Sequence, residues 1–442
     1  NIIGLLRKLS INGDNLMKKL MILSVGGSAE PVINAVKKGK ADYYYFFCSS
    51  GPKGSDRLIE APGDPCGDPR KAECPKCSEN FFIGNPKGPS IIAQTGLSDD
   101  QWEIIRVADP DDLDECYKTL LGVKEKIFAT HGDACLITAN YTGGTKTMSV
   151  ALGFMGIFNE SWQLNINKGP RQDLIKVRIG DTPVAVDKTR MFAEHQLIIA
   201  RKAIQEFDYA RAESVLSDIL SYRLDRETSG EIQDAVNACR AFDHWDKFNH
   251  ETALNLLKEC KAKYPDFIIA LKKILGLQRV VSGYEMVGDL LNNAERRAHR
   301  GYYDDAVGRL YRATELFAQI RLKTAHNLDS AEMKLADLPA ELRPKYASRT
   351  RENNKLLIGL REDYALLADL NDTVGIRYEN SSKKITDILN KRNKSIFAHG
   401  VQPLSEGDYR KVRETLAGFI ADCASAVKIE YLMPQMPREG LI

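Results

Sequence analysis

The chain has 442 residues, of which 43% are hydrophobic and 28% are charged, so it is long enough for two or three globular domains. Its formal net charge of +2 argues against a protein that coats nucleic acid, and it restricts any such contact to local patches. No apolar stretch reaches the roughly 18 residues that a membrane span needs and no export signal is visible, so we expect a cytoplasmic protein with reduced cysteines.

The chain begins with a segment, 1–16, that we expect to be an extension without function. Residues 19–26 then form a buried-strand pattern that ends in the loop Gly26-Gly27-Ser28. An acid and a proline follow directly and suit the first turn of a helix. The pattern therefore predicts a strand, a glycine loop and a helix in that order.

Residues 51–90 are rich in glycine, proline and cysteine, and we expect an insertion without regular structure. Cys66, Cys74 and Cys77 lie here, the last two in a C-x2-C pattern that is typical of half a structural zinc site. A second such pair is missing, so the fourth ligand would be Cys48 or a histidine. Either the cluster holds zinc or its members are loop thiols without a metal.

After the insertion, strands and helices alternate. We expect strands at 102–108, 134–140, 163–167 and 174–179, and helices at 111–126 and from the loop after residue 140 through 158. Such alternation with apolar strands predicts a doubly wound, mostly parallel, Rossmann-like sheet over residues 17–188. Ligands of these sheets bind beyond the carboxyl ends of the strands.

The loop after the strand at 134–140 has the composition of an anion site. Gly143 and Gly144 let the backbone approach a ligand, and the following helix offers its free N–H groups. The loop is neither a Walker A motif nor G-x-G-x-x-G, so we expect a phosphate-bearing ligand that needs no magnesium. The alternative is that the glycines only serve tight turns. The predicted ligand-binding residues are Gly26, Gly27, Ser28, Asn140, Thr142, Gly143, Gly144, Thr145 and Lys146.

From residue 189 the sequence becomes helical. Residues 189–300 predict a linker domain of stacked helical hairpins. Residues 301–442 hold four amphipathic patterns, which is the number that a four-helix bundle needs; they lie at 304–326, 353–371, 378–401 and 405–428.

The third of these patterns carries Arg392, Asn393 and His399. Seven residues make two helical turns, so Arg392 and His399 would share a face about 10 Å apart along the axis. A guanidinium binds phosphate in bidentate fashion, and an imidazole transfers protons near neutral pH. Together they suit metal-free cleavage of RNA, in which the substrate's 2′-hydroxyl is the nucleophile. The alternative is a basic helix end whose histidine caps or packs.

The motifs together resemble a known family. The segment ANYTGGTKTMSVAL on a Rossmann-like sheet resembles a CARF sensor domain, and KRNKSIFAHG on a helical bundle resembles a HEPN ribonuclease domain. Sensor first and nuclease last is the order in CARF–HEPN ribonucleases of type III CRISPR systems, which cyclic oligoadenylates activate. The insertion at 51–90 and the long segment 189–300 depart from the minimal pattern.

The resemblance implies a homodimer in which two sets of Arg392, Asn393 and His399 form one cleft for single-stranded RNA. His399 would transfer the proton, Arg392 would hold the scissile phosphate, and Asn393 would orient one of them. It further implies 2′,3′-cyclic phosphate products, no catalytic metal, no DNA substrate, and a cyclic oligoadenylate activator, with tetra-adenylate preferred over hexa-adenylate.

Two alternatives remain open from the sequence. Tyr311, Arg312 and Glu315 on the first bundle helix either brace the catalytic helix or form a network within their own helix. The whole chain, if not an enzyme, would be a nucleotide-sensing regulator or RNA-binding protein whose bundle only dimerises. Activity measured with and without the activator separates these functions.

Overall fold

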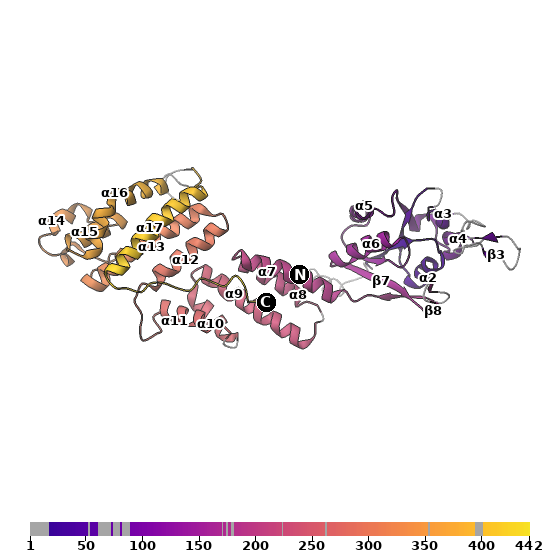
Figure 1. Ribbon diagram of the computed structural model, residues 1–442, viewed down its shortest axis with the longest axis horizontal. Coiled ribbons are helices and arrows are strands. Elements are labelled where there is room, and N and C mark those ends of the chain that lie inside the picture. Colours follow the sequence, from indigo (N-terminus) through magenta and orange to yellow (C-terminus); the bar gives the residue numbers. More distant parts are fainter. Residues whose placement is uncertain are drawn as a thin grey trace. The chain divides into compact units, whose positions relative to one another are not determined.

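The computed structural model divides the chain into two compact units, 1–194 and 195–442, of which the first contains all the strands that the structure describes (Figure 1). The described residues are 17–51, 54–60, 72–73, 80–81, 89–169, 171–173, 176–177, 181–222, 224–260, 263–351, 354–393 and 401–442. The predicted extension, 1–16, lies outside them. Among the helices of these ranges, none has the length and apolar character that crossing a membrane requires.

The first unit is built on a six-stranded sheet with the order β10-β7-β6-β1-β2-β5. Its strands are β1 (Lys18–Val25), β2 (Tyr43–Ser49), β5 (Trp102–Val107), β6 (Cys135–Asn140), β7 (Trp162–Lys168) and β10 (Thr182–Ala185). All neighbouring strands are parallel except β10, which is antiparallel to β7. The predicted doubly wound, mostly parallel sheet is confirmed.

Helices cover both faces of this sheet. One face packs against α2 (Glu30–Gly39), α3 (Arg57–Glu60) and α4 (Ile91–Thr95), and the other packs against α5 (Leu113–His131) and α6 (Lys146–Phe158). The central strand β1 serves both cores in alternation, since Leu20 and Ile22 face α5 and α6 whereas Met21 and Leu23 face α2. Burial on both faces explains why this strand is a continuous apolar run.

Two expectations for the first unit are wrong in detail. The insertion at 51–90 has some regular structure, namely α3 and a pair of two-residue strands, β3 (Ala72–Glu73) and β4 (Asn80–Phe81). The strand expected at 174–179 is instead part of a separate two-stranded sheet, β8 (Arg171–Asp173) with β9 (Lys176–Val177). An alternating apolar pattern predicts an extended segment but does not identify its partner, and β10 completes the large sheet.

The second unit is helical. Its helices are α7 (Thr189–Gln205), whose first residues belong to the first unit, α8 (Tyr209–Ile219), α9 (Arg226–Asp246), α10 (His250–Glu259), α11 (Pro265–Ile274), α12 (Glu285–His299), α13 (Tyr303–His326), α14 (Arg343–Tyr346), α15 (Leu360–Asp369), α16 (Thr373–Asn393) and α17 (Glu406–Ala426). Several of the turns between them contain a residue with positive φ, among them Phe207, Phe248 and Gly301.

The four expected bundle helices are α13, α15, α16 and α17, which pack around one apolar core that includes Phe317, Tyr364, Ile385 and Phe419. The pattern at 353–371 begins as a helix only at Leu360. Residues before it are held differently, since backbone bridges join Lys355 to Lys334 and Leu356 to Thr350. Tertiary pairing therefore overrides the local helical pattern there.

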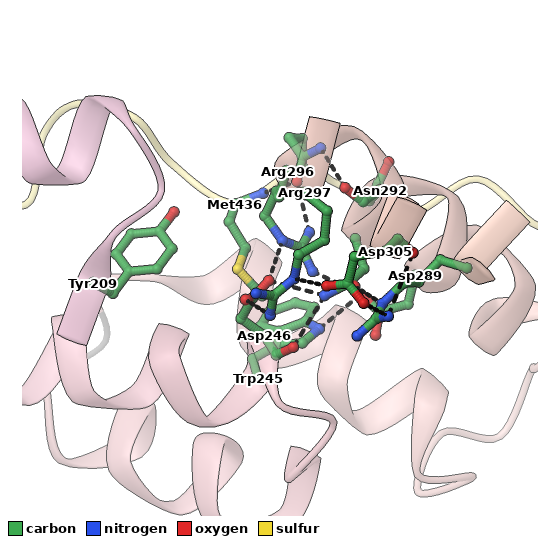
Figure 2. A network of polar contacts seen from close by, with 12 residues as sticks. Tyr209, Trp245, Asp246, Asp289, Asn292, Arg296, Arg297, Asp305 and Met436 are labelled. Atoms are coloured by element: carbon green, nitrogen blue, oxygen red, sulfur yellow. Dashed lines mark hydrogen bonds and ion pairs between the residues drawn. The ribbon is translucent and has the colours of Figure 1, made fainter. Parts of the chain in front are cut away.

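A buried polar network joins the bundle to the helices before it (Figure 2). Asp246, at the end of α9, accepts hydrogen bonds from Arg296 Nε at 2.7 Å and Arg297 Nη2 at 2.6 Å. Arg296 is 1% exposed, and its Nη1 also donates to Gln435 of the C-terminal segment at 2.7 Å. Asp289 accepts from Trp245 Nε1 at 2.9 Å. Because a buried guanidinium is costly without these acceptors, the network fixes α9, α12 and the C-terminal segment in one arrangement.

Candidate functional site

The two predicted glycine loops lie together at the centre of the sheet edge. The chain runs outward from β1 through β2 to β5 and then returns to β6 on the other side of β1. The carboxyl ends of β1 and β6 are therefore the point at which the strand order reverses, with Leu23 paired to Asn140. Ligands of doubly wound folds bind at this point. Gly26-Gly27-Ser28 follows β1, and the Thr142–Lys146 loop follows β6.

Close backbone contact explains the glycines. A Cβ on Gly26 would lie 2.7 Å from the backbone nitrogen of Gly144, and one on Gly143 would overlap the carbonyl oxygen of Ser24. Gly144 also has a φ of +83°, which side chains other than hydrogen disfavour. The Ser24 hydroxyl donates to the Gly143 carbonyl at 2.7 Å. The two loops thus form one surface, which depends on the lack of side chains.

Several predicted ligand residues use their side chains to hold the loop. Thr145 is the N-cap of α6, since its hydroxyl accepts from Met148 N at 3.2 Å, and it also donates to Pro110 O at 2.6 Å. Asn140 is buried, and its side-chain oxygen accepts from the Thr142 hydroxyl at 2.7 Å. These three side chains therefore position the loop.

The groups that face solvent are different ones. Gly27 and Lys146 are exposed, and Ser28 is partly exposed. The first turn of α6 contains no acidic residue, so nothing on this helix neutralises the partial positive charge at its N-terminus. A bound anion would meet backbone N–H groups, the Lys146 ammonium and the Ser28 hydroxyl at this surface.

A buried polar cluster behind the loop was not found from the sequence. Asn167, near the end of β7, accepts from Asn140 Nδ2 at 2.9 Å and donates its own amide to Pro31 O at 2.7 Å and to Asp181 at 3.0 Å. Its backbone N–H donates to the Thr142 hydroxyl at 2.7 Å. Asp181 also accepts from Asn34 of α2. The one sequence signal was an asparagine at the carboxyl end of a strand beside the loop.

This cluster joins both loops. Asn167 contacts Thr142 of one loop and Pro31, in the first turn of α2, which follows the other loop. The side chains are buried, and the amide and carboxylate groups satisfy each other. A fully bonded buried network of this kind holds a single conformation. The loop site is therefore preformed.

The predicted catalytic residues lie at the end of α16. Arg392 and Asn393 are the last two residues of this helix, and His399 lies outside the described residues. Arg392 follows Ile388 by one turn, and Ile388 packs against the bundle core. A hollow of about 260 Å³ beside this turn is lined by Lys384, Asp387, Ile388, Lys411, Glu414 and Thr415 of α16 and α17. The hollow therefore lies between α16 and α17, one turn before the end of α16.

The polar residues on α13 interact along their own helix. Arg312 donates to Glu315 at 2.7 Å and to Gln319 at 2.9 Å, and all three residues belong to the first bundle helix. The hydrogen bonds described for Arg312 and Glu315 lie within α13, as in the second alternative above, and the Glu315 carboxylate also lies near Asp363 of α15. No contact described for them reaches α16.

The predicted zinc ligands Cys66, Cys74 and Cys77 lie outside the described residues. Among the residues that the structure does describe, no three histidine, cysteine or acidic side chains gather closely enough to hold a metal. Cys48 is buried in β2 and its thiol lies 3.5 Å from the Ile105 carbonyl. Burial raises the pKa of Cys48 to about 12, which disfavours the thiolate that zinc binds.

Comparisons with family models and with solved structures find similar proteins, whereas the comparison with curated proteins finds none. Residues 279–422 match the family model of the Csm6 HEPN domain. A Csm6 from Enterococcus italicus, solved bound to cyclic hexa-2′-fluoro-hexa-dAMP, has a similar fold, with a TM-score of 0.55 and 14% sequence identity over 93% of this chain and 95% of that chain. No curated protein matches the chain in sequence.

Proposed function

We propose that this chain is a CARF–HEPN ribonuclease of type III CRISPR defence that a cyclic oligoadenylate activates. One observation carries the proposal. Arg392, Asn393 and His399 all fall inside residues 279–422, the part that matches the Csm6 HEPN domain. We further propose that it acts in the cytoplasm, which the free thiols of all the described cysteines support.

The proposed reaction uses the RNA's own 2′-hydroxyl as nucleophile. His399 removes the proton from this hydroxyl or donates one to the 5′-oxygen leaving group. Arg392 binds the scissile phosphate and offsets the charge that develops on it, and Asn393 orients the histidine or the phosphate. The products are a 2′,3′-cyclic phosphate and a 5′-hydroxyl. No step requires a metal ion.

The loop site is the proposed sensor. The preformed glycine surface, the uncompensated N-terminus of α6 and the exposed Lys146 suit the phosphates of a cyclic oligoadenylate. The sequence resemblance favours tetra-adenylate, whereas the Enterococcus italicus Csm6 was solved with a six-membered ring analogue. Both rings therefore belong in the test.

We also propose that the protein acts as a homodimer. The exposed side of α6 carries Val150, Phe154 and Phe158 at helical spacing, with the two phenylalanine rings stacked 5.8 Å apart. A hollow of about 520 Å³ lies beside them, lined by Leu113, Asp114, Tyr117, Phe154 and Phe158. Exposed apolar surface of this kind favours association, and here it lies on the helix that begins at the sensor loop. Pairing along α6 would place two loops near one ring.

Cleavage of single-stranded RNA, measured with no ligand, with cyclic tetra-adenylate and with cyclic hexa-adenylate, tests the proposal. We expect one ring to accelerate cleavage and EDTA to leave the rate unchanged. Ligand binding without cleavage under any condition would instead support the non-catalytic regulator. A strict requirement for magnesium or manganese would contradict the metal-free mechanism.

A further inference from the structure

The helix that begins at the sensor loop, α6, is capped at its C-terminal end by Lys188. This lysine lies in the segment that leads from the first unit to the second. Lys188 donates from Nζ to the carbonyl oxygens of Gly156 at 2.7 Å, Asn159 at 2.6 Å and Glu160 at 3.2 Å. These carbonyls lie at the C-terminal end of α6, where helical carbonyls lack partners within the helix and a cation is favoured. The lysine therefore caps α6 from another part of the chain.

Lys188 is partly buried at this cap. Burial lowers the pKa of its ammonium to about 8, and the nearby Glu160 carboxylate offsets part of that effect. Burial of a charged ammonium costs free energy, and here three carbonyl oxygens match its three donors. Lys188 is therefore held in one position, unlike a surface lysine in solvent. The contact is specific.

The backbone of Lys188 starts the next helix. Asp187 caps α7 by accepting from Thr189 N at 2.9 Å, and Lys188 O accepts from Phe192 N at 2.9 Å. Phe192 and Ala193 are buried, so this first turn is packed. The boundary between the two units falls after Glu194, within α7. Lys188 thus ties the C-terminal end of α6 to the first turn of the helix that crosses between the units.

Beyond the boundary the contacts continue within the second unit. Arg438 of the C-terminal segment donates to Gln205 O at the end of α7 at 2.8 Å, and the Tyr209 hydroxyl donates to Pro437 O at 2.8 Å. The same segment reaches α12 through Gln435 and Arg296, part of the network of Figure 2. Within the second unit, the C-terminal segment therefore joins the linker helices to the bundle.

We propose that Lys188 is a positioning residue that transmits ligand occupancy at the α6 N-terminus to the second unit. Thirteen residues separate the two ends of α6, which is about 20 Å of rigid helix. A shift of α6 on ligand binding therefore moves its C-terminal carbonyls and, through Lys188, the start of α7. This inference rests on the proposed function, since it names how that sensor site is read out. Coupling between two sites typically changes binding affinity by roughly 5- to 150-fold.

Lys124 offers a matched control. It comes from α5 and donates from Nζ to the Asn159 side chain at 2.6 Å, at the same end of α6. Lys124→Met removes a lysine from this helix end without touching the connection to α7. Lys188→Met removes both the cap and the connection, and Lys188→Arg keeps a cation with several donors. A merely local role in α6 stability would make the two methionine variants alike.

The test compares wild type, Lys188→Met, Lys188→Arg and Lys124→Met. Binding of cyclic tetra- and hexa-adenylate is followed by thermal shift, activation by RNA cleavage, and the state of residues 189–194 by amide hydrogen exchange. We expect Lys188→Met to bind the ring within about threefold of wild type but to lose roughly tenfold or more of the activation. Lys124→Met should keep both, and Lys188→Arg should recover part of the activation. Of the four proteins, only wild type and Lys124→Met should show slower amide hydrogen exchange at residues 189–194 when the ring is bound.

The outcomes separate this inference from the proposed function. Activation of Lys188→Met equal to wild type, or equal losses in both methionine variants, overturns the role of Lys188. If wild type binds a ring but never cleaves RNA, the nuclease assignment fails, and the exchange pattern at 189–194 still decides the role of Lys188. If wild type binds neither ring, the sensor assignment fails and the transmission role fails with it.

Discussion

The loop site of the first unit is made by segments far apart in the chain, whereas the proposed catalytic motif lies within eight consecutive residues. Ser24 and Gly143, whose backbones meet in the loop site, are 119 residues apart. Arg392 and His399 are seven residues apart in the sequence, which would be two turns of one helix. A site built from distant backbone depends on how strands and buried amides are arranged. A site built from one helix depends on its own side chains, so the two should fail differently when mutated.

The sharpest contrast is expected at His399. Replacing His399 by Ala removes the proton-transfer group, so RNA cleavage should fall about 100- to 10,000-fold. Binding of cyclic oligoadenylate should not change, because the histidine does not belong to the unit that holds the loops. Cleavage rates and ligand affinity, measured on the same preparation, check both statements. A loss below about tenfold would remove His399 from the mechanism.

The opposite failure is expected at Gly143. In Gly143→Ala the new Cβ meets the backbone oxygen of Ser24, so one of the two loops must move. We expect ligand affinity to fall roughly tenfold or more, with destabilisation of about 1–3 kcal/mol. Gly153→Ala in α6 is the control, because its Cβ meets no atom within 4 Å. If both alanine variants bind the ring equally well, the close approach of the loops is not needed for binding.

A charge exchange tests whether buried amides preform the loop site. Asn167→Asp places a carboxylate against Asp181 and removes the donor to Pro31, so we expect affinity to fall about tenfold. Adding Asp181→Asn restores an amide–carboxylate pair and should recover part of the loss. Titration calorimetry of the two single variants and the double variant measures the coupling. Additive losses in the double variant would mean that these two side chains act independently.

Reversing the exposed charge at the loop should have a smaller effect. Lys146→Glu puts a negative charge beside the helix N-terminus, where the proposed ligand places its phosphates. We expect several-fold weaker binding and activation at correspondingly higher ring concentrations, most clearly at low salt. Activation curves at two ionic strengths measure this. Wild-type activation at every concentration would show that Lys146 does not contact the ring.

The smallest effect concerns stability and contrasts two buried carboxylates. Asp181 accepts hydrogen bonds from two asparagine amides, whereas Asp363 in α15 is fully buried close to another carboxylate. Burial, with the nearby Glu315 carboxylate, raises the pKa of Asp363 to about 7. The folded state then binds this proton more tightly than the unfolded state, so the contribution of Asp363 to stability falls as pH rises from about 4 to 7. Asp363→Asn should raise the free energy of unfolding by about 1–2 kcal/mol at pH 8 and little at pH 4, as denaturant titration can check.

Local patterns were enough to predict the alternating sheet, its glycine loops and the four bundle helices. These features follow from residue periodicity and turn chemistry, which a short window of sequence contains. The Arg392 motif was found in the same way, because all its members lie on one expected helix. The strand expected at 174–179 and the helix expected to begin at 353 were wrong, since pairing partners decided both.

By itself, the sequence determined the residue types that can bind a phosphate or move a proton. Only the tertiary structure decided that Gly26, Gly143 and Gly144 touch and that Asn167 and Asp181 hold them in place. In the tertiary structure the hydroxyls of Thr142 and Thr145 also bind backbone groups and so hold the loop. Lys188 binds carbonyl oxygens at the C-terminal end of α6. Such roles depend on backbone groups brought together across the sheet edge, and no periodicity in the sequence encodes which distant carbonyl a side chain will reach.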